Sequence, residues 1–175
     1  MEVLCIVKRP PGSMFARHDG SLSGETSENG RYMSSRFRDS RAVLAVQDLA
    51  RSTRYYTEVL GFTLDPIHAP GWSFLSRDGI QLMLGECPDE VAAGETGNHS
   101  WFAWIRVEDV DALHRDVAGR GAEVIIPPGD RDHGHREFGV RTPDGHRILF
   151  AEPQAWIRER EAGSGERGPR GREEG

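Results

Sequence analysis

The chain has 175 residues, 37% of them hydrophobic, and a formal net charge of −6. That is enough for one domain with a buried core, and no apolar run reaches the roughly 20 residues that a membrane-spanning helix needs. The 22 basic residues form no stripe, so the composition predicts no membrane or nucleic-acid partner. The two cysteines predict neither a disulfide framework nor a zinc site, and a reducing cytoplasm is the expected location.

The two ends of the chain differ in composition from its middle. Residues 1–38 are rich in glycine, serine, proline and charge, lack helical or strand periodicity, and are predicted to be a disordered N-terminal extension. Residues 39–155 are expected to form the folded domain. Trp156 and Ile157 can add a short helix, but residues 156–175, which end in a run of Gly, Arg and Glu, are predicted to be a disordered C-terminal tail.

The first half of the domain shows a regular succession of elements. Residues 42–46 are an apolar strand, and Asp48 then stands at an N-cap position before a helix expected over 49–60. A short strand at 62–64 follows. Residues 74–84 then form a hairpin that turns at Arg-Asp-Gly.

The second half repeats this order. A strand is expected from residue 101 to 107, Asp109 is the next N-cap, and a helix over 110–119 precedes a strand at 123–126. The hairpin 136–152 closes the repeat, and its Thr-Pro-Asp-Gly sequence fits a type I turn.

Short motifs align the two halves. Val-Gln-Asp-Leu at 46–49 matches Val-Glu-Asp-Val at 107–110, and Asp-Gly at 78–79 matches Asp-Gly at 144–145. Two tandem βαβββ modules are therefore predicted, with residues 41–86 in the first module and 100–152 in the second.

This tandem pattern resembles the vicinal oxygen chelate superfamily, which includes glyoxalase I, extradiol dioxygenases, thiol transferases that inactivate fosfomycin, and bleomycin resistance proteins. Arg136-Glu137-Phe138 followed by Pro143-Asp144-Gly145-His146 is most similar to the bleomycin resistance branch. The resemblance implies an α+β fold, in which the two βαβββ modules form a curved, mixed sheet around a cleft. It also implies a homodimer.

The resemblance places metal ligands on the cleft face of four strands. Carried over by strand register, these four positions fall on Arg41, Gln81, Phe102 and Leu149. Only Gln81 has a donor atom suited to a metal. No metal, no cofactor and no catalytic residue is therefore expected. His133 and His135 could hold a metal from an extended segment, but solvated loop histidines are the commoner case.

Strand alternation gives the cleft face an apolar and aromatic lining, which suits a flat organic ligand. The expected phase puts Phe102 and Trp104 in the cleft, while Trp101, Ala103 and Ile105 pack towards the helices. The complete set of predicted ligand-binding residues is Val43, Trp72, Phe74, Gln81, Met83, Phe102, Trp104, Arg106, Phe138 and Leu149.

Three functions fit these features. The favoured one is a small-molecule binding protein that sequesters a bulky, partly aromatic ligand without metal, and the acidic net charge favours a cationic ligand. The alternative is a metal-dependent lyase, isomerase or dioxygenase with a non-standard ligand set. The third is a catalytically silent module that serves in assembly or regulation.

Overall fold

The computed structural model describes residues 39–165, so the disorder predicted for 1–38 and 166–175 lies outside the described residues. The described residues from Arg41 onward belong to one compact unit. None of the helices in this range is both long and apolar enough to cross a membrane.

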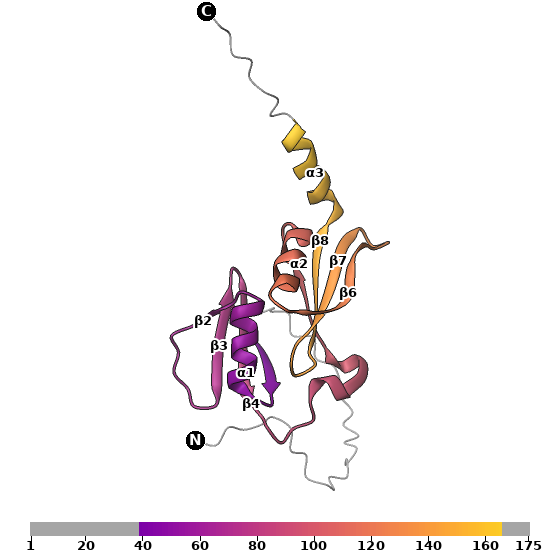
Figure 1. Ribbon diagram of the computed structural model, residues 1–175. Coiled ribbons are helices and arrows are strands. Elements are labelled where there is room, and N and C mark those ends of the chain that lie inside the picture. The colour runs from indigo at the N-terminus through magenta and orange to yellow at the C-terminus, as the bar shows by residue number, and fades with distance from the viewer. Residues whose placement is uncertain (1–38, 166–175) are drawn as a thin grey trace, which may run out of the picture. The chain divides into compact units, whose positions relative to one another are not determined.

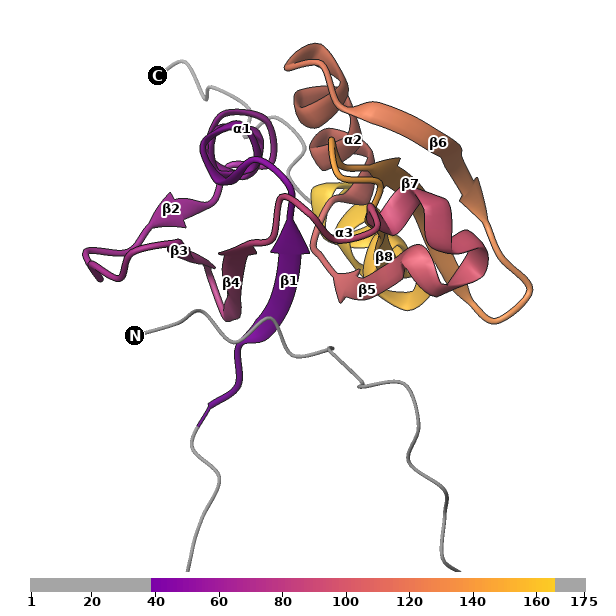
Figure 2. The ribbon, with the colours of Figure 1, turned by 90° about the horizontal axis from the view of Figure 1, so that it is seen from below.

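The first module is a four-stranded mixed sheet with a helix on one face (Figures 1 and 2). The strand order is β1-β4-β3-β2, with β1 parallel to β4 and the other pairs antiparallel. The helix begins as α1 and continues through a five-residue π-helical segment, Tyr55–Val59. The bounds of the elements are β1 Ala42–Val46, α1 Leu49–Arg54, β2 Thr63–Leu64, β3 Trp72–Arg77 and β4 Ile80–Glu86.

The second module repeats the first. Its strand order is β5-β8-β7-β6, again with one parallel pair, β5 and β8. Between the modules, Ala93–Ser100 forms 3₁₀ turns with a kink at Gly97. The predicted α+β fold of two βαβββ modules is confirmed. The bounds are β5 Trp101–Arg106, α2 Val110–Gly119, β6 Glu123–Asp130, β7 His135–Arg141 and β8 Arg147–Pro153.

Both predicted N-caps are confirmed. Asp48 accepts a hydrogen bond of 2.8 Å from the backbone N–H of Arg51, and Asp109 accepts one of 3.0 Å from Ala112. Each carboxylate therefore satisfies an N–H group that the first helical turn leaves without a partner.

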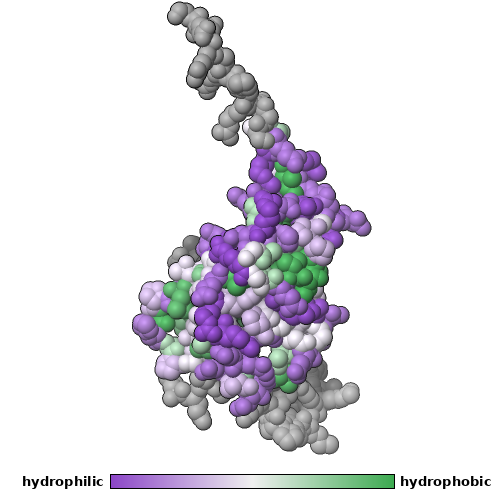
Figure 3. Space-filling view, viewed as in Figure 1, coloured by the Kyte–Doolittle hydropathy of each residue, from purple (hydrophilic) through white to green (hydrophobic). Residues whose placement is uncertain are grey.

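The core lies between each sheet and its helix. Along β1, Leu44 and Val46 are buried, whereas Val43 and Ala45 are exposed, so alternate residues face opposite sides of the sheet. We call the side of each sheet away from its helix the helix-free face. Figure 3 shows the molecule from the side on which α1 lies in front, and this surface is mostly hydrophilic with small, separate hydrophobic patches.

The chain after β8 differs from the prediction. A disordered tail was expected from residue 156, but α3 spans Gln154–Gly165 (Figure 1). An ion pair explains part of this order, because the exposed guanidinium of Arg160 bonds to the carboxylate of Glu152, which is fully buried in β8. A buried carboxylate without a partner is costly, so this pair stabilises the first turns of α3 against the second module.

Candidate ligand-binding face

The helix-free face of the first sheet carries a row of apolar side chains. Val43 in β1 is the register partner of Met83 in β4, which is the partner of Phe74 in β3. Val43 is 55% exposed, and the other two are partly exposed. The three side chains therefore form one continuous strip across the sheet.

Trp72 lies on the same face, next to this strip. A Cβ atom built on Gly85 would lie 2.9 Å from the indole of Trp72, so the ring rests directly on the glycine backbone. Gln81 pairs with Ser76 on the other side of the strip. All five residues predicted for the first module thus share the helix-free face, as alternation along the strands predicted.

One charged group borders this strip. The guanidinium of Arg41 lies 5.8 Å from the centroid of the Phe74 ring and forms an ion pair of 2.7 Å with Asp65. A hydrogen bond from Ser76, and then the one from Arg41, hold the pKa of the Asp65 carboxyl below its usual value. The positive charge of Arg41 is therefore already paired.

The helix-free face of the second sheet is centred on Trp104, which is 46% exposed. Trp104 is the register partner of Leu149, and Leu149 is the partner of Gly139. A Cβ atom on Gly139 would lie 3.3 Å from Ile126, so the isoleucine covers the glycine. Trp104 and Leu149 stand on the face that the sequence predicted.

A β-bulge overturns the prediction for the start of β5. Trp101 pairs with Arg147 and Ala103 pairs with Ile148, so Phe102 is an extra residue between them. Phe102 packs against the core, and its ring lies 6.1 Å from that of His146. Trp101 is instead 36% exposed, with the guanidinium of Arg147 4.5 Å from its ring centroid. The prediction exchanged the faces of Phe102 and Trp101, because the extra residue interrupts strict alternation.

Phe138 is also misplaced in the predicted set. It is fully buried, stacks on Phe150 at 5.1 Å between ring centroids, and contacts the ring of His114 in α2 at 5.2 Å. Its neighbour Glu137 stands on the helix-free face, because residues adjacent in a strand point to opposite sides. Phe138 is therefore a core residue.

Glu137 is a site residue that the sequence analysis missed. The residue is 5% exposed, and its carboxylate accepts a hydrogen bond of 2.7 Å from the indole N–H of Trp104. The Nε of Arg131 lies 3.8 Å from one carboxylate oxygen and the Nε2 of His133 lies 3.5 Å from the other. The ring of His135 meets that of Trp104 edge to face, at 5.1 Å. The alternation that excludes Phe138 would have placed Glu137 beside Trp104.

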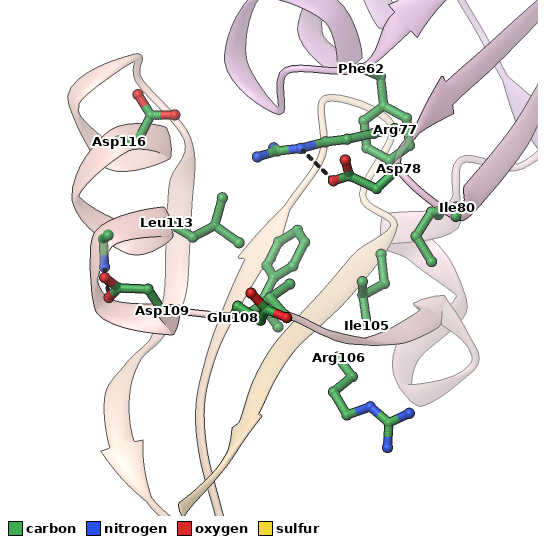
Figure 4. A pocket seen from close by; sticks show the side chains of 14 residues that line it. Phe62, Arg77, Asp78, Ile80, Ile105, Arg106, Glu108, Asp109, Leu113 and Asp116 are labelled. Atoms are coloured by element: carbon green, nitrogen blue, oxygen red, sulfur yellow. Dashed lines mark hydrogen bonds and ion pairs between the residues drawn. The ribbon is translucent and has the colours of Figure 1, made fainter. Parts of the chain in front are cut away.

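A cavity of about 790 Å³ lies elsewhere, between the β3–β4 turn and α2 (Figure 4). Arg106 lines it, but the other nine predicted residues do not. In Figure 4 the Arg106 side chain points away from the other lining side chains, and its guanidinium lies 5.4 Å from the ring of Trp156. The remaining lining residues are mainly of two kinds. Some are apolar, such as Phe62, Ile80 and Leu113, and others are charged, such as Arg77, Asp78, Glu108 and Asp116.

Few of the predicted metal-ligand positions hold a donor side chain. In residues 39–165 no group of three or more His, Cys, Asp or Glu side chains is arranged to hold one. The Nδ1 atoms of His133 and His135 lie 3.3 Å apart, but they belong to no such group. Of the four positions that the resemblance assigns to metal ligands, Gln81 alone has a suitable donor.

Comparison with known proteins decides the family. Residues 40–150 match the family model of the Glyoxalase/Bleomycin resistance protein/Dioxygenase superfamily. The chain belongs to this superfamily. A bleomycin resistance protein of Geobacillus stearothermophilus is 30% identical over 123 residues, which cover 61% of this chain and 90% of the relative. A bleomycin resistance protein of Staphylococcus aureus matches to the same extent.

Solved structures of the superfamily share the fold. The bleomycin-binding protein of bleomycin-producing Streptomyces verticillus, in complex with copper(II)-bleomycin, is 28% identical with a TM-score of 0.53, covering 66% of this chain and 96% of that chain. A glyoxalase/bleomycin resistance protein/dioxygenase of Alicyclobacillus acidocaldarius is 20% identical with a TM-score of 0.57, covering 66% and 91%. The second similarity concerns the fold alone.

Proposed function

We propose that this member of the superfamily is a small-molecule binding protein that sequesters a bulky, partly aromatic ligand on its helix-free faces. The observation that carries the proposal is the exposure of large apolar side chains on these faces. Val43, Trp101 and Trp104 are each more than a third exposed. Such side chains provide large contact areas and stack on planar rings.

The similarity to bleomycin resistance proteins supports the same class of ligand. The relative from Streptomyces verticillus is a bleomycin-binding protein. Resistance by binding, without chemical change of the ligand, is the biological role that we propose for this chain. The side chains on the second face fit a binding role, because the carboxylate of Glu137 is held by Trp104 rather than facing an open reaction site.

We further propose that the protein acts as a homodimer. The faces that carry Val43 and Trp104 are partly exposed in a single chain, and a second copy would close a cleft over them. Sedimentation velocity of the full chain should give twice the mass of 19.5 kDa. A monomer at micromolar concentration would contradict the proposed assembly.

Fluorescence titration tests the ligand class. The full chain is titrated with copper(II)-bleomycin and with planar three-ring aromatic compounds, and tryptophan emission is followed. Replacing Trp104 by Ala should weaken binding about 3- to 10-fold, since an aromatic contact contributes about 0.5–1.5 kcal/mol. Trp104→Phe keeps a ring and should recover part of the affinity.

The matched control is Trp156→Ala, which removes an exposed indole from α3. Its affinity should stay within about 2-fold of wild type. If no probe binds up to about 1 mM, or if both variants lose affinity equally, the helix-free face is not the binding site.

A further inference from the structure

Arg147 stands on the second helix-free face and has no carboxylate partner among the described residues. From this unpaired positive charge we infer that the ligand carries an acidic group. This inference rests on the proposed function and adds the chemical class of the ligand: an aromatic ring system bearing a carboxylate or a similar anion. Arg147 would receive the anion while Trp104 and Leu149 contact the rings.

The position of Arg147 is fixed by neighbours that leave its charge unpaired. Its Nε donates a hydrogen bond of 2.6 Å to the hydroxyl of Ser100, and its Nη2 donates to the carbonyl of Gly97 and to Asn98. One face of the guanidinium lies over the ring of Trp101. All of these partners are neutral, so they orient the group without cancelling its charge.

Several other arginines in or next to the two sheets have carboxylate partners. Arg41 pairs with Asp65, Arg136 pairs with Asp111 and Asp130, and Arg141 pairs with Glu123. Within the described part of the chain, no carboxylate lies within 4.0 Å of a side-chain nitrogen of Arg147, and no acceptor bonds to its Nη1. Two N–H groups of Nη1 therefore remain for a ligand.

The register places this cation beside the aromatic surface. Arg147 and Leu149 are two residues apart in β8 and point to the same side, which separates them by about 7 Å. Leu149 is the partner of Trp104, and Arg147 is the partner of Trp101. An anion attached to a ring on Trp104 can thus reach Arg147, and a planar guanidinium suits the geometry of a carboxylate.

Two acidic residues stand on this face, and neither competes for Arg147. Glu123 lies opposite Arg141, the register partner of Arg147, and forms an ion pair of 2.8 Å with that arginine. The carboxylate of Glu137 is nearly buried, accepts from Trp104, and has Arg131 and His133 close by. Arg106 follows Trp104 by two residues in β5 and therefore lies on the same face. It also lacks a carboxylate partner among the described residues. The net charge of −6 favours a cationic ligand at long range, whereas the local charge on this face favours an anion.

The test uses three probes that share one ring system and differ in one substituent. Anthraquinone-2-carboxylate, the corresponding carboxamide and the aminomethyl derivative are titrated into the full chain by isothermal titration calorimetry. Wild type should bind the carboxylate about 10-fold more tightly than the carboxamide, because a charge-assisted bond adds to the same ring contacts. Raising NaCl from 50 to 500 mM should reduce this preference and leave carboxamide binding unchanged, because salt screens an exposed charge pair.

Variants of Arg147 separate ligand recognition from a structural role. Arg147→Gln should reduce the ratio of carboxylate to carboxamide affinity to within about 2-fold, while carboxamide affinity changes little. Arg147→Lys, which keeps the charge, should retain part of the ratio. Arg158→Gln removes an exposed charge from α3 and should leave the ratio at its wild-type value.

The outcomes distinguish the inference from the function on which it rests. A wild-type preference for the carboxamide or the ammonium probe overturns the inference, as does an unchanged ratio in Arg147→Gln. Binding of the carboxamide would still support the proposed function in those cases. If none of the three probes binds up to about 1 mM, both fail. A preference that Arg147→Gln abolishes and salt weakens supports the anion site.

Discussion

The carboxylate of Asp144 in the β7–β8 turn accepts a hydrogen bond of 2.9 Å from the backbone N–H of Gln47 in the first module. It also accepts from the hydroxyl of Ser52, and its side chain is 1% exposed. The matching aspartate of the first module, Asp78, is 93% exposed and lies 3.9 Å from Arg77. The repeat thus uses one turn aspartate to join the modules and leaves the other beside the cavity of Figure 4.

This asymmetry predicts different effects of one substitution. Asp144→Asn should lower the free energy of unfolding by about 1–3 kcal/mol, because a buried, charged acceptor with several donors loses its charge. Asp78→Asn should change it by less than about 0.5 kcal/mol, since Asn tolerates the positive φ of this position and little is buried. Urea denaturation of both variants measures the difference, and equal effects would mean that Asp144 does not hold the modules together.

The β-bulge in β5 leads to a second prediction. Phe102→Ala should cost about 2–4 kcal/mol, because the ring packs against the core. Trp101→Ala should cost less than about 1 kcal/mol, because this indole is more than a third exposed and contacts Arg147 at the surface. Denaturant titration of the two variants decides between the bulged register and strict alternation, which predicts the opposite order.

Features that depend on nearby residues were predictable from the sequence. The two N-caps, at Asp48 and Asp109, follow from the chemistry of one side chain and the next helical turn. The faces of Val43, Met83 and Trp104 follow from alternation along single strands.

Features that depend on distant partners were not predictable in this way. The bulge at Phe102 is set by pairing with β8, about 45 residues away in the chain. The bond between Asp144 and Gln47 joins residues 97 apart. The helix α3 is held through the pair of Arg160 with Glu152. Phe138 differs, since the alternation that placed Trp104 would have assigned Phe138 to the core.

Glu152 gives a third prediction, on the pH dependence of stability. Burial acts to raise the pKa of this carboxyl, but hydrogen bonds from Arg160 and from the backbone N–H groups of Val110 and Asp109 outweigh it, and the pKa lies below its usual value. The folded state therefore binds the proton less readily than the unfolded state. Its contribution to stability is present above about pH 4.5 and is lost as the pH falls through the folded-state pKa.

Glu152→Gln removes this titration. The variant should be about 1–3 kcal/mol less stable at pH 7, because the charge-assisted bonds to Arg160 and α2 are weakened. Below about pH 4.5 its stability should fall less steeply with decreasing pH than that of wild type. Urea denaturation at a series of pH values gives both curves, and parallel curves would show that Glu152 does not contribute to acid unfolding.

The fourth prediction concerns metal. We expect purified protein to hold less than about 0.1 equivalent of zinc, iron, manganese or nickel, because the residues at the positions that the family resemblance assigns to ligands are Arg41, Gln81, Phe102 and Leu149. Elemental analysis measures this content, and dialysis against EDTA should leave the affinity for an aromatic probe unchanged. Near-stoichiometric metal would instead favour the alternative of a metal-dependent lyase, isomerase or dioxygenase. Gln81→Ala then locates the metal site. If this variant loses the metal, the site lies on the helix-free face, and if it keeps the metal, the site lies elsewhere.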